Sequence, residues 1–319
     1  MNEPKALKIG LALAAVYVIW GSTYLAIRFA IETLPPFWMA GVRFLVSGLL
    51  LYGWARWRGA PKPSRIHWGS AALIGGLLLL GGNGAVVWAE QRLDSGAAAL
   101  LVSTVPIWMV LFEWLRRGGT RPTLGVVAGL ALGFAGLVML VKPSGGDTGG
   151  FDAVGVAVLL LGCMSWAWGS LRSRHVPLPE SPLLATGMEM LAGGALFMVA
   201  GLLTGEAGRL DLAAASPKSL LALGYLVLFG SLLGFTAYIW LLRVTSPALA
   251  STYAYVNPVV AVLLGWAFAG EPLTAGMLVA AAVILTGVAL ITVFRNRPPS
   301  PQQQSRQPEM ESQASKAAA

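Results

Sequence analysis

The chain has 319 residues, of which 56% are hydrophobic and 11% are charged. A soluble domain carries about 25% charged residues, so this composition cannot cover a water-exposed surface and excludes an ordinary soluble enzyme. The net charge of +8 does not indicate a nucleic-acid partner. The basic residues lie in short segments between apolar runs, as they do on the cytoplasmic side of membrane proteins. The lipid bilayer is therefore the expected partner of most of the surface.

Ten apolar segments are long enough to cross a bilayer, whose hydrocarbon layer of about 30 Å needs about 20 apolar residues in a helix. In chain order, the predicted transmembrane helices are 7–28, 36–55, 68–90, 95–115, 122–141, 153–171, 183–204, 218–241, 247–269 and 274–294. The first apolar run is too long for a signal peptide, which predicts a retained helix. The connections are short and contain Pro and Gly, so the predicted fold class is all-α integral membrane.

The distribution of Lys and Arg predicts the orientation of these helices. With a cytoplasmic N-terminus, sixteen of the 22 basic residues fall in cytoplasmic segments and five in external ones, while Arg43 lies within a span. This bias follows the positive-inside rule and places both termini in the cytoplasm. Residues 295–319 are rich in Pro, Gln and Ser, and we expect a disordered cytoplasmic tail there.

The two halves of the chain predict an internal repeat. The matching features are Trp20-Gly21-Ser22 with Trp168-Gly169-Ser170, Gly41 and Gly48 with Gly187 and Gly194, Pro106 with Pro258, and Gly125 and Gly136 with Gly276 and Gly287. Each half, 1–143 and 151–294, contains five predicted spans. Five is odd, so the second half enters the membrane from the opposite side. The prediction is two inverted five-helix repeats, an architecture of secondary transporters.

Several short motifs point to a known family. They are Trp20-Gly21-Ser22, Pro35-Pro36, Ser95-Gly96-Ala97, Thr104-Val105-Pro106, Tyr255-Val256-Asn257-Pro258 and the turn Gly270-Glu271-Pro272. With these motifs the chain resembles the EamA-type drug/metabolite transporters, a family of ten-helix exporters. The segment from Asn83 to Glu90 resembles its YedA-like subgroup of the bacterial inner membrane. One departure is that the first half has Arg117-Gly118-Gly119-Thr120 where the family carries a Glu in this turn.

The resemblance implies secondary active export of small organic solutes (amino acids, metabolites or drugs) by alternating access across the bacterial inner membrane. Import or facilitated movement of the same solutes is an alternative that the residues do not separate from export. The proton is one candidate coupling ion, and the solute's own gradient is another. The sequence leaves the substrate and the oligomeric state open.

Three charged residues are candidates for coupling or gating: Arg43, Glu90 and Glu189. A charge at the centre of a span costs at least about 2.5–3.5 kcal/mol, so it needs a partner or a water-filled cavity. Arg43 and Glu189 occupy equivalent repeat positions, and we expect them to approach each other or a shared cavity. The alternative is that each charge has a local partner. Glu90 either forms an interfacial pair with its charged neighbours or is a proton-linked carboxylate at the outer gate.

Polar and aromatic residues at membrane depth are the candidates for substrate binding. They are Trp20, Asn83, Trp88, Thr104, Trp168, Tyr238, Tyr253 and Asn257. Prolines free backbone groups near Thr104 and Asn257, and such positions line binding sites in transporters. The aromatic rings suit flat or cationic organic solutes. Packing and hydrogen bonding between helices are the alternative roles for each residue.

The motifs of an enzyme are missing from the sequence. His67 and His175 lie far apart in predicted loops, so no metal site is expected, and no phosphate-binding loop or Ser–His pair is present. A membrane enzyme or lipid-handling protein, the alternative from another class, would need such a cluster. The prediction is a transporter that requires no cofactor.

Overall fold

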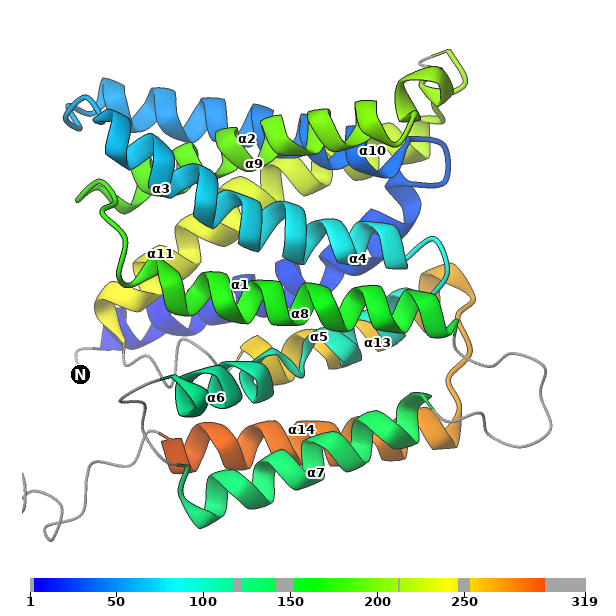
Figure 1. The fold of residues 1–319 in the computed structure, drawn as a ribbon. Coiled ribbons are helices and arrows are strands. Elements are labelled where there is room, and N and C mark those ends of the chain that lie inside the picture. Colours follow the sequence, from blue (N-terminus) through cyan, green and yellow to red (C-terminus); the bar gives the residue numbers. More distant parts are fainter. Residues whose placement is uncertain (1–2, 117–121, 142–151, 212, 246–252, 296–319) are drawn as a thin grey trace, which may run out of the picture.

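The computed structural model describes residues 3–116, 122–141, 152–211, 213–245 and 253–295, and within these ranges the regular secondary structure is entirely helical (Figure 1). The first half comprises α1 (Glu3–Ala30), α2 (Pro36–Trp57), α3 (Arg65–Gly75), η1 (Gly76–Asn83), α4 (Gly84–Ala89), α5 (Ser95–Val102), α6 (Val105–Leu115) and α7 (Leu124–Val141). The second comprises α8 (Ala153–Ser173), α9 (Pro182–Leu203), η2 (Glu206–Arg209), α10 (Pro217–Tyr225), η3 (Leu226–Leu233), α11 (Gly234–Val244), α13 (Tyr253–Ala269) and α14 (Ala275–Arg295).

The described residues form ten apolar spans, which confirms the predicted fold class. Eight helical segments are long and apolar enough to cross a membrane, and the shorter apolar helices Leu124–Leu140 and Val256–Ala269 complete the set. The bounds of the eight longer spans agree with the prediction to within three residues. Residues 247–252 of the predicted ninth span and residues 296–319 of the predicted tail lie outside the described residues.

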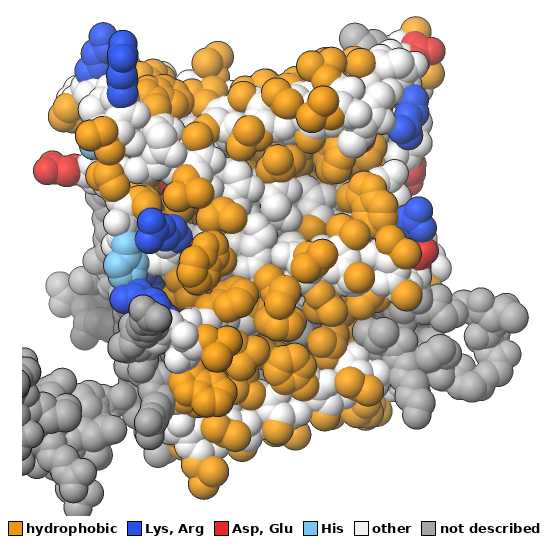
Figure 2. Space-filling model, viewed as in Figure 1, with side chains coloured by type: hydrophobic (Ala, Val, Ile, Leu, Met, Phe, Trp, Pro, Cys, Tyr) orange, Lys and Arg blue, Asp and Glu red, His pale blue; other side chains and the backbone are white. Residues whose placement is uncertain are grey.

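The surface matches a membrane-embedded helical bundle. Figure 2 shows hydrophobic side chains covering the middle of the visible face, while charged side chains gather near the two ends of the helices. Large apolar residues are exposed along the spans, among them Leu11, Leu50, Leu161, Val199 and Leu263. In water such a surface would aggregate, whereas lipid tails solvate it.

The contact between α2 and α9 shows how the two halves are related. A Cβ at Gly41 would lie 3.4 Å from Gly194 O, and a Cβ at Gly48 would lie 2.9 Å from Gly187 O. As the residue number rises along α2, it falls along α9, so the helices are antiparallel. Gly41 and Gly48 are also the repeat equivalents of Gly187 and Gly194, which makes the contact self-complementary. Two inverted repeats related by a two-fold axis produce this pattern.

A second contact, between α7 and α14, has the same geometry. A Cβ at Gly129 would lie 2.7 Å from Gly287 O, and one at Gly136 would lie 2.7 Å from Ile284 Cγ1. The two helices lie side by side in Figure 1 and are again antiparallel. Small residues let the backbones of membrane helices approach closely, and here they do so at both contacts.

Two π-helical segments interrupt the third and eighth spans, which the sequence predicted as uninterrupted helices. η1 and η3 are each eight residues long and begin at Gly76 and Leu226, and they lie in the third span of their respective halves. Hydrophobic periodicity identifies an apolar helix but not its hydrogen-bond register, so the sequence did not reveal them. π-Helical turns are rare in proteins, and those that occur are often found at functional sites.

The two proline-containing spans behave differently from each other. In the fourth span, α5 ends at Val102 and α6 begins at Val105, because Pro106 lacks the N–H that would continue the ladder. In the ninth span, α13 runs through Pro258 without a break. The expected interruption is therefore present near Thr104 but not near Asn257.

Candidate functional site

Arg43 lies in the middle of the bundle and is held by the second half. It is 5% exposed on α2, and its Nε donates to Ser231 Oγ of η3 at 3.0 Å. Its guanidinium carbon lies 4.8 Å from the centre of the Phe44 ring. A Cβ at Gly230 would lie 3.2 Å from Arg43 Nη2, so the absent side chain there makes room for the guanidinium. The charge predicted within the second span is thus bound to the π-helical segment.

Glu90 follows the last residue of α4 and is completely buried. Neither carboxylate oxygen has a hydrogen-bond partner in the described part of the chain. Arg28 of α1 donates from Nη1 to the backbone carbonyl of Glu90 at 2.7 Å, not to its carboxylate. Arg28, Arg43 and Glu271 are close enough to interact electrostatically with the carboxylate. A buried carboxylate with no direct partner needs an explanation.

Four aromatic residues from three helices form one cluster, which we call the aromatic cluster: Trp20, Phe235, Tyr238 and Tyr253. The Trp20 ring lies 5.3 Å from Phe235, 5.1 Å from Tyr238 and 5.0 Å from Tyr253, centre to centre. Tyr238 and Tyr253 are 5.5 Å apart and nearly perpendicular. Trp20 Nε1 donates to Gly230 O at 3.1 Å. Three of the predicted substrate-binding residues therefore lie together, and the cluster is attached to η3 beside Arg43.

One face of α1 connects the aromatic cluster to Glu90. Trp20, Tyr24 and Arg28 are spaced by four residues and so share a face of the helix. Tyr24 interacts electrostatically with Glu90, and Tyr253 interacts with Tyr24. Within the described residues, the Tyr24 side chain makes no hydrogen bond. The face carries an indole, a phenol and a guanidinium between the two halves.

Thr104 and Asn257 lie in helix contacts. Thr104 Oγ1 donates to the Leu101 carbonyl at 2.6 Å, and Cys163 Sγ of α8 approaches the same oxygen at 3.6 Å. The Asn257 amide nitrogen, when turned toward its acceptors, donates to the carbonyls of Tyr17 and Tyr253 at 3.3 and 3.1 Å. The Cys163 bond joins α8 to α5, and the Asn257 bond to Tyr17 joins α13 to α1. The Thr104 bond stays within its own span.

Trp88, Trp168 and Asn83 are not in the aromatic cluster. Trp88 lies 5.0 Å beneath the Arg92 guanidinium, which pairs with Asp152 at 2.9 Å. Trp168 is about half exposed, and its ring contacts Phe112 edge-on. Asn83 is the last residue of η1 and is partly buried.

Arg43 and Glu189 do not form an ion pair in this conformation. The ion pairs among the described residues are Arg92–Asp152 and Lys218–Glu32, and Arg43 donates to Ser231. Glu189 is partly buried on α9, whose backbone lies against Gly75 of α3.

Two glutamates of the second half bind helix N-termini of the first half. Glu271 accepts from Ser95 N at 2.7 Å and from Gly96 N at 3.0 Å, which caps α5. Glu206 Oε2 accepts from the second and third residues of α2 at 2.9 and 3.1 Å. Burial raises the pKa of Glu206, while these two N–H groups lower it. A carboxylate at a helix N-terminus accepts hydrogen bonds from the free N–H groups there and is attracted to the positive end of the helix dipole.

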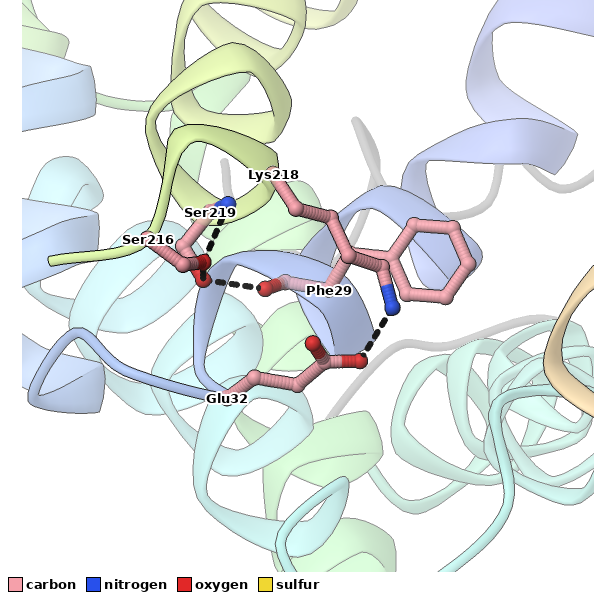
Figure 3. Close-up of polar contacts among 5 residues, drawn as sticks. All are labelled: Phe29, Glu32, Ser216, Lys218 and Ser219. Atoms are coloured by element: carbon pink, nitrogen blue, oxygen red, sulfur yellow. Dashed lines mark hydrogen bonds and ion pairs between the residues drawn. The ribbon is translucent and has the colours of Figure 1, made fainter.

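A third connection between the halves joins α1 to α10 (Figure 3). Lys218 Nζ donates to Glu32 Oε1 at 2.6 Å and lies 3.7 Å from the centre of the Phe29 ring. Ser219 Oγ donates to the Phe29 carbonyl at 2.7 Å, while Ser216 Oγ accepts from Ser219 N and so caps α10. The lysine pair is exposed and adds little stability alone, but it lies beside bonds that are shielded from water.

These connections, together with Arg92–Asp152, all lie at one end of the bundle, on the right in Figure 1. In the described part of the chain, the opposite end has one side-chain hydrogen bond between the halves, Arg116 Nη1 to His175 Nε2 at 3.3 Å. We call the end of the bundle that carries these contacts the latched end, and its residues are Glu271, Glu206, Lys218–Glu32 and Arg92–Asp152. We call Arg43, Ser231 and the aromatic cluster together the central site. Glu206 and Lys218 of the latched end, like Ser231 and Phe235 of the central site, were not singled out from the sequence.

Comparison with known proteins identifies the relatives of this architecture. Residues 7–142 and 153–293 each match the EamA-like transporter family. The uncharacterized inner membrane transporter YedA of Escherichia coli is 46% identical over 283 residues, which cover 88% of this chain and 90% of YedA. The chloroplastic WAT1-related protein At3g02690 of Arabidopsis thaliana is 28% identical, over 88% of this chain and 68% of that protein. A crystal structure with 21% sequence identity has a TM-score of 0.61 and covers 91% of this chain and 99% of its own, which shows the same fold.

Proposed function

Because the chain belongs to the EamA-like transporter family, we propose that it exports small organic solutes by secondary active transport across the bacterial inner membrane, with both termini in the cytoplasm. The observation that carries this proposal is the buried Arg43 beside the aromatic cluster, between two inverted halves. A buried charge in a membrane span marks a site for solute or ions. Family membership and the inner-membrane relative support a transporter rather than an enzyme.

The proposed mechanism is alternating access. In the orientation that the basic residues predict, the latched end faces outward, so the contacts of Glu271 and Glu206 close the external route in this conformation. Rocking of one half against the other breaks these contacts and opens the site outward. Inverted repeats support this motion because each half can adopt the conformation of the other.

Within this proposal the predicted residues take different roles. Trp20, Tyr238 and Tyr253 contact the flat or apolar part of the solute, and Arg43 contacts a polar group. Arg43 uses Nε for Ser231, which leaves its other guanidinium N–H groups for a solute. Two roles stay predictions: Glu189 as a coupling or gating charge, and substrate binding by Asn83, Trp88, Thr104, Trp168 and Asn257.

The proposal is tested by solute flux in oriented vesicles. Inside-out membrane vesicles that contain the protein are incubated with a panel of amino acids, metabolites and drugs, with and without a pH gradient. Export predicts that at least one solute accumulates to a higher level in these vesicles than in vesicles without the protein. Import predicts uptake only in right-side-out vesicles, and a membrane enzyme predicts a chemically altered solute. A panel that shows no protein-dependent flux would count against the proposal.

A matched pair of variants assigns the flux to the central site. Arg43→Gln removes the buried charge and is expected to reduce flux at least ten-fold. Arg58→Gln removes an exposed charge next to the end of the same helix and is expected to leave flux unchanged. Equal flux in both variants would show that Arg43 is not part of the route.

A further inference from the structure

We propose that Glu90 is a proton-binding site whose occupancy changes during transport. The proposal deepens the exporter function and rests on it for the coupling, although proton binding itself is independent of any solute. It makes one carboxylate, at the end of α4, the point where the proton gradient acts on the protein.

The first step of the argument is the isolation of the carboxylate. Glu90 is completely buried, and both oxygens lack a hydrogen-bond partner among the described residues. A charged carboxylate in an apolar environment without hydrogen bonds is strongly unfavourable, and a bound proton removes that charge. The carboxylate of Glu90 therefore has no ligand in this conformation, and a proton is the smallest ligand that would neutralise it.

The second step concerns the arginines. Arg28 and Arg43 are both near enough to attract the carboxylate, yet neither forms an ion pair with it. Arg28 donates to the backbone carbonyl of Glu90, and Arg43 donates to Ser231. Their positive charges let Glu90 exist in its ionised form, and the missing direct bonds leave it able to become neutral. Both charge states are thus accessible.

The third step is the charge of the whole group. The ionisable residues around the site are Arg28 of α1, Arg43 of α2, Asp94 in front of α5 and Glu271 after α13, with the neutral Tyr24 of α1. When all carboxylates are ionised, these residues and Glu90 carry one net negative charge. One proton brings the sum to zero. The balance suits a single exchangeable proton.

A proton fits this site better than a metal cation does. Among the described residues, no group of three or more His, Cys, Asp or Glu side chains could hold a metal ion. Cations such as Ca²⁺ and Mg²⁺ need about six or more oxygen ligands, whereas a proton needs one. A protonated Glu90 also becomes a hydrogen-bond donor.

Glu90 lies four residues before the partly exposed Asp94 and interacts electrostatically with Arg43 of the central site. Asp94 is partly exposed at the latched end and directly precedes α5. Burial and the neighbouring Glu271 raise the pKa of Asp94, which favours proton capture there. Glu90 also interacts electrostatically with Tyr24 and with the charge of Arg43. Neutralising Glu90 removes the attraction on Arg43 and so changes the charge that the central site presents.

The proton is measured directly by infrared difference spectroscopy of the full chain in liposomes, as the pH is changed between about 5 and 8. We expect the C=O stretching band of a carboxylic acid shielded from water to appear at the lower pH. Glu90→Gln is expected to lose this band, and Glu180→Gln, which removes an exposed carboxylate, to keep it. Glu90→Asp keeps a carboxyl group and is expected to show the band at a shifted frequency and pH midpoint.

A band that persists in Glu90→Gln, or a wild-type protein without a pH-dependent band, would overturn the proposal. Coupling is measured in proteoliposomes with a solute from the transport panel. The ratio of flux with and without a pH gradient is expected to exceed unity in the wild type and to fall to unity in Glu90→Gln. A flux that follows a Na⁺ gradient instead would also overturn it. Absence of all flux, with the infrared band present, would reject the exporter function but not the proton site.

Discussion

The contact between α2 and α9 predicts a large effect of a single methyl group. In Gly48→Ala, the added Cβ would lie 2.7 Å from Leu191 N and 2.9 Å from Gly187 O. Ordinary van der Waals contact begins near 3.4 Å, so the two backbones must separate by about 0.7 Å. Neither clashing atom belongs to a flexible side chain that could move away.

The magnitude follows from opposing terms. Overpacking of this kind costs about 1–3 kcal/mol. Alanine regains about 0.5–1 kcal/mol because glycine is a poor helix former. We therefore expect Gly48→Ala to destabilise the protein by about 0–2.5 kcal/mol relative to the wild type, and by about 1–3 kcal/mol relative to an alanine on the same helix that meets no atom. Its contact partner on the other helix, Gly187→Ala, meets Tyr52 N at 2.7 Å and is expected to behave alike.

The assay is thermal unfolding in detergent, followed by circular dichroism. The matched control is Gly53→Ala on the same helix, where an added Cβ meets no atom within 4 Å. It is expected to unfold at the wild-type temperature or slightly above. Because both substitutions push apart the same helices, the double variant Gly48→Ala/Gly187→Ala is expected to lose less than the sum of the single losses. A Gly48→Ala protein as stable as the control would refute the reasoning.

Three further predictions concern the latched end and the central site. Glu271→Gln weakens the cap of α5 and is expected to cost about 0.5–2 kcal/mol in thermal unfolding, whereas the exposed Glu180→Gln is expected to cost nothing measurable. Trp20→Phe removes the indole hydrogen bond to η3 and is expected to cost about 0.5–1.5 kcal/mol in the same assay. The N–H of Gly155 and the Arg92 guanidinium lower the pKa of Asp152. Its stabilising contribution is therefore present above the ordinary carboxyl pKa of about 3.9 and is lost as the pH falls through the lowered value. The difference in unfolding temperature between the wild type and Asp152→Asn is expected to vanish in acid.

The spans could be predicted from the length and composition of the apolar runs, and the repeat from residues that recur at matching positions in the two halves. Apolar runs of bilayer length specify membrane helices regardless of their partners. The equivalence of Gly41 and Gly187 was visible in the sequence because a close helix contact tolerates little other than glycine. The contact itself, in which Gly41 faces Gly194, follows once the two halves are inverted.

The central site was only partly predictable. Trp20, Tyr238 and Tyr253 stood out as aromatic residues at membrane depth, and the structure brings them together. Arg43 stood out as a charge in a span, but its partner Ser231 lies in an apolar run where a serine gives no signal. Pairing depends on the rotation of each helix about its axis, and the π-helical register changes that rotation locally.

The π-helical segment η3 has a further consequence for the central site. Successive residues of an α-helix are turned by about 100° around its axis, because one turn holds 3.6 residues. If η3 changed to ordinary α-helical pairing, the helix beyond it would rotate by about one residue position. The Gly230 carbonyl, which accepts from Trp20, and the Ser231 hydroxyl, which accepts from Arg43, both lie within this segment. A slip of hydrogen bonds by one place would therefore exchange the partners of both residues without bending the span. Since η1 occupies the same place in the other half, each half has its own position for such a rotation.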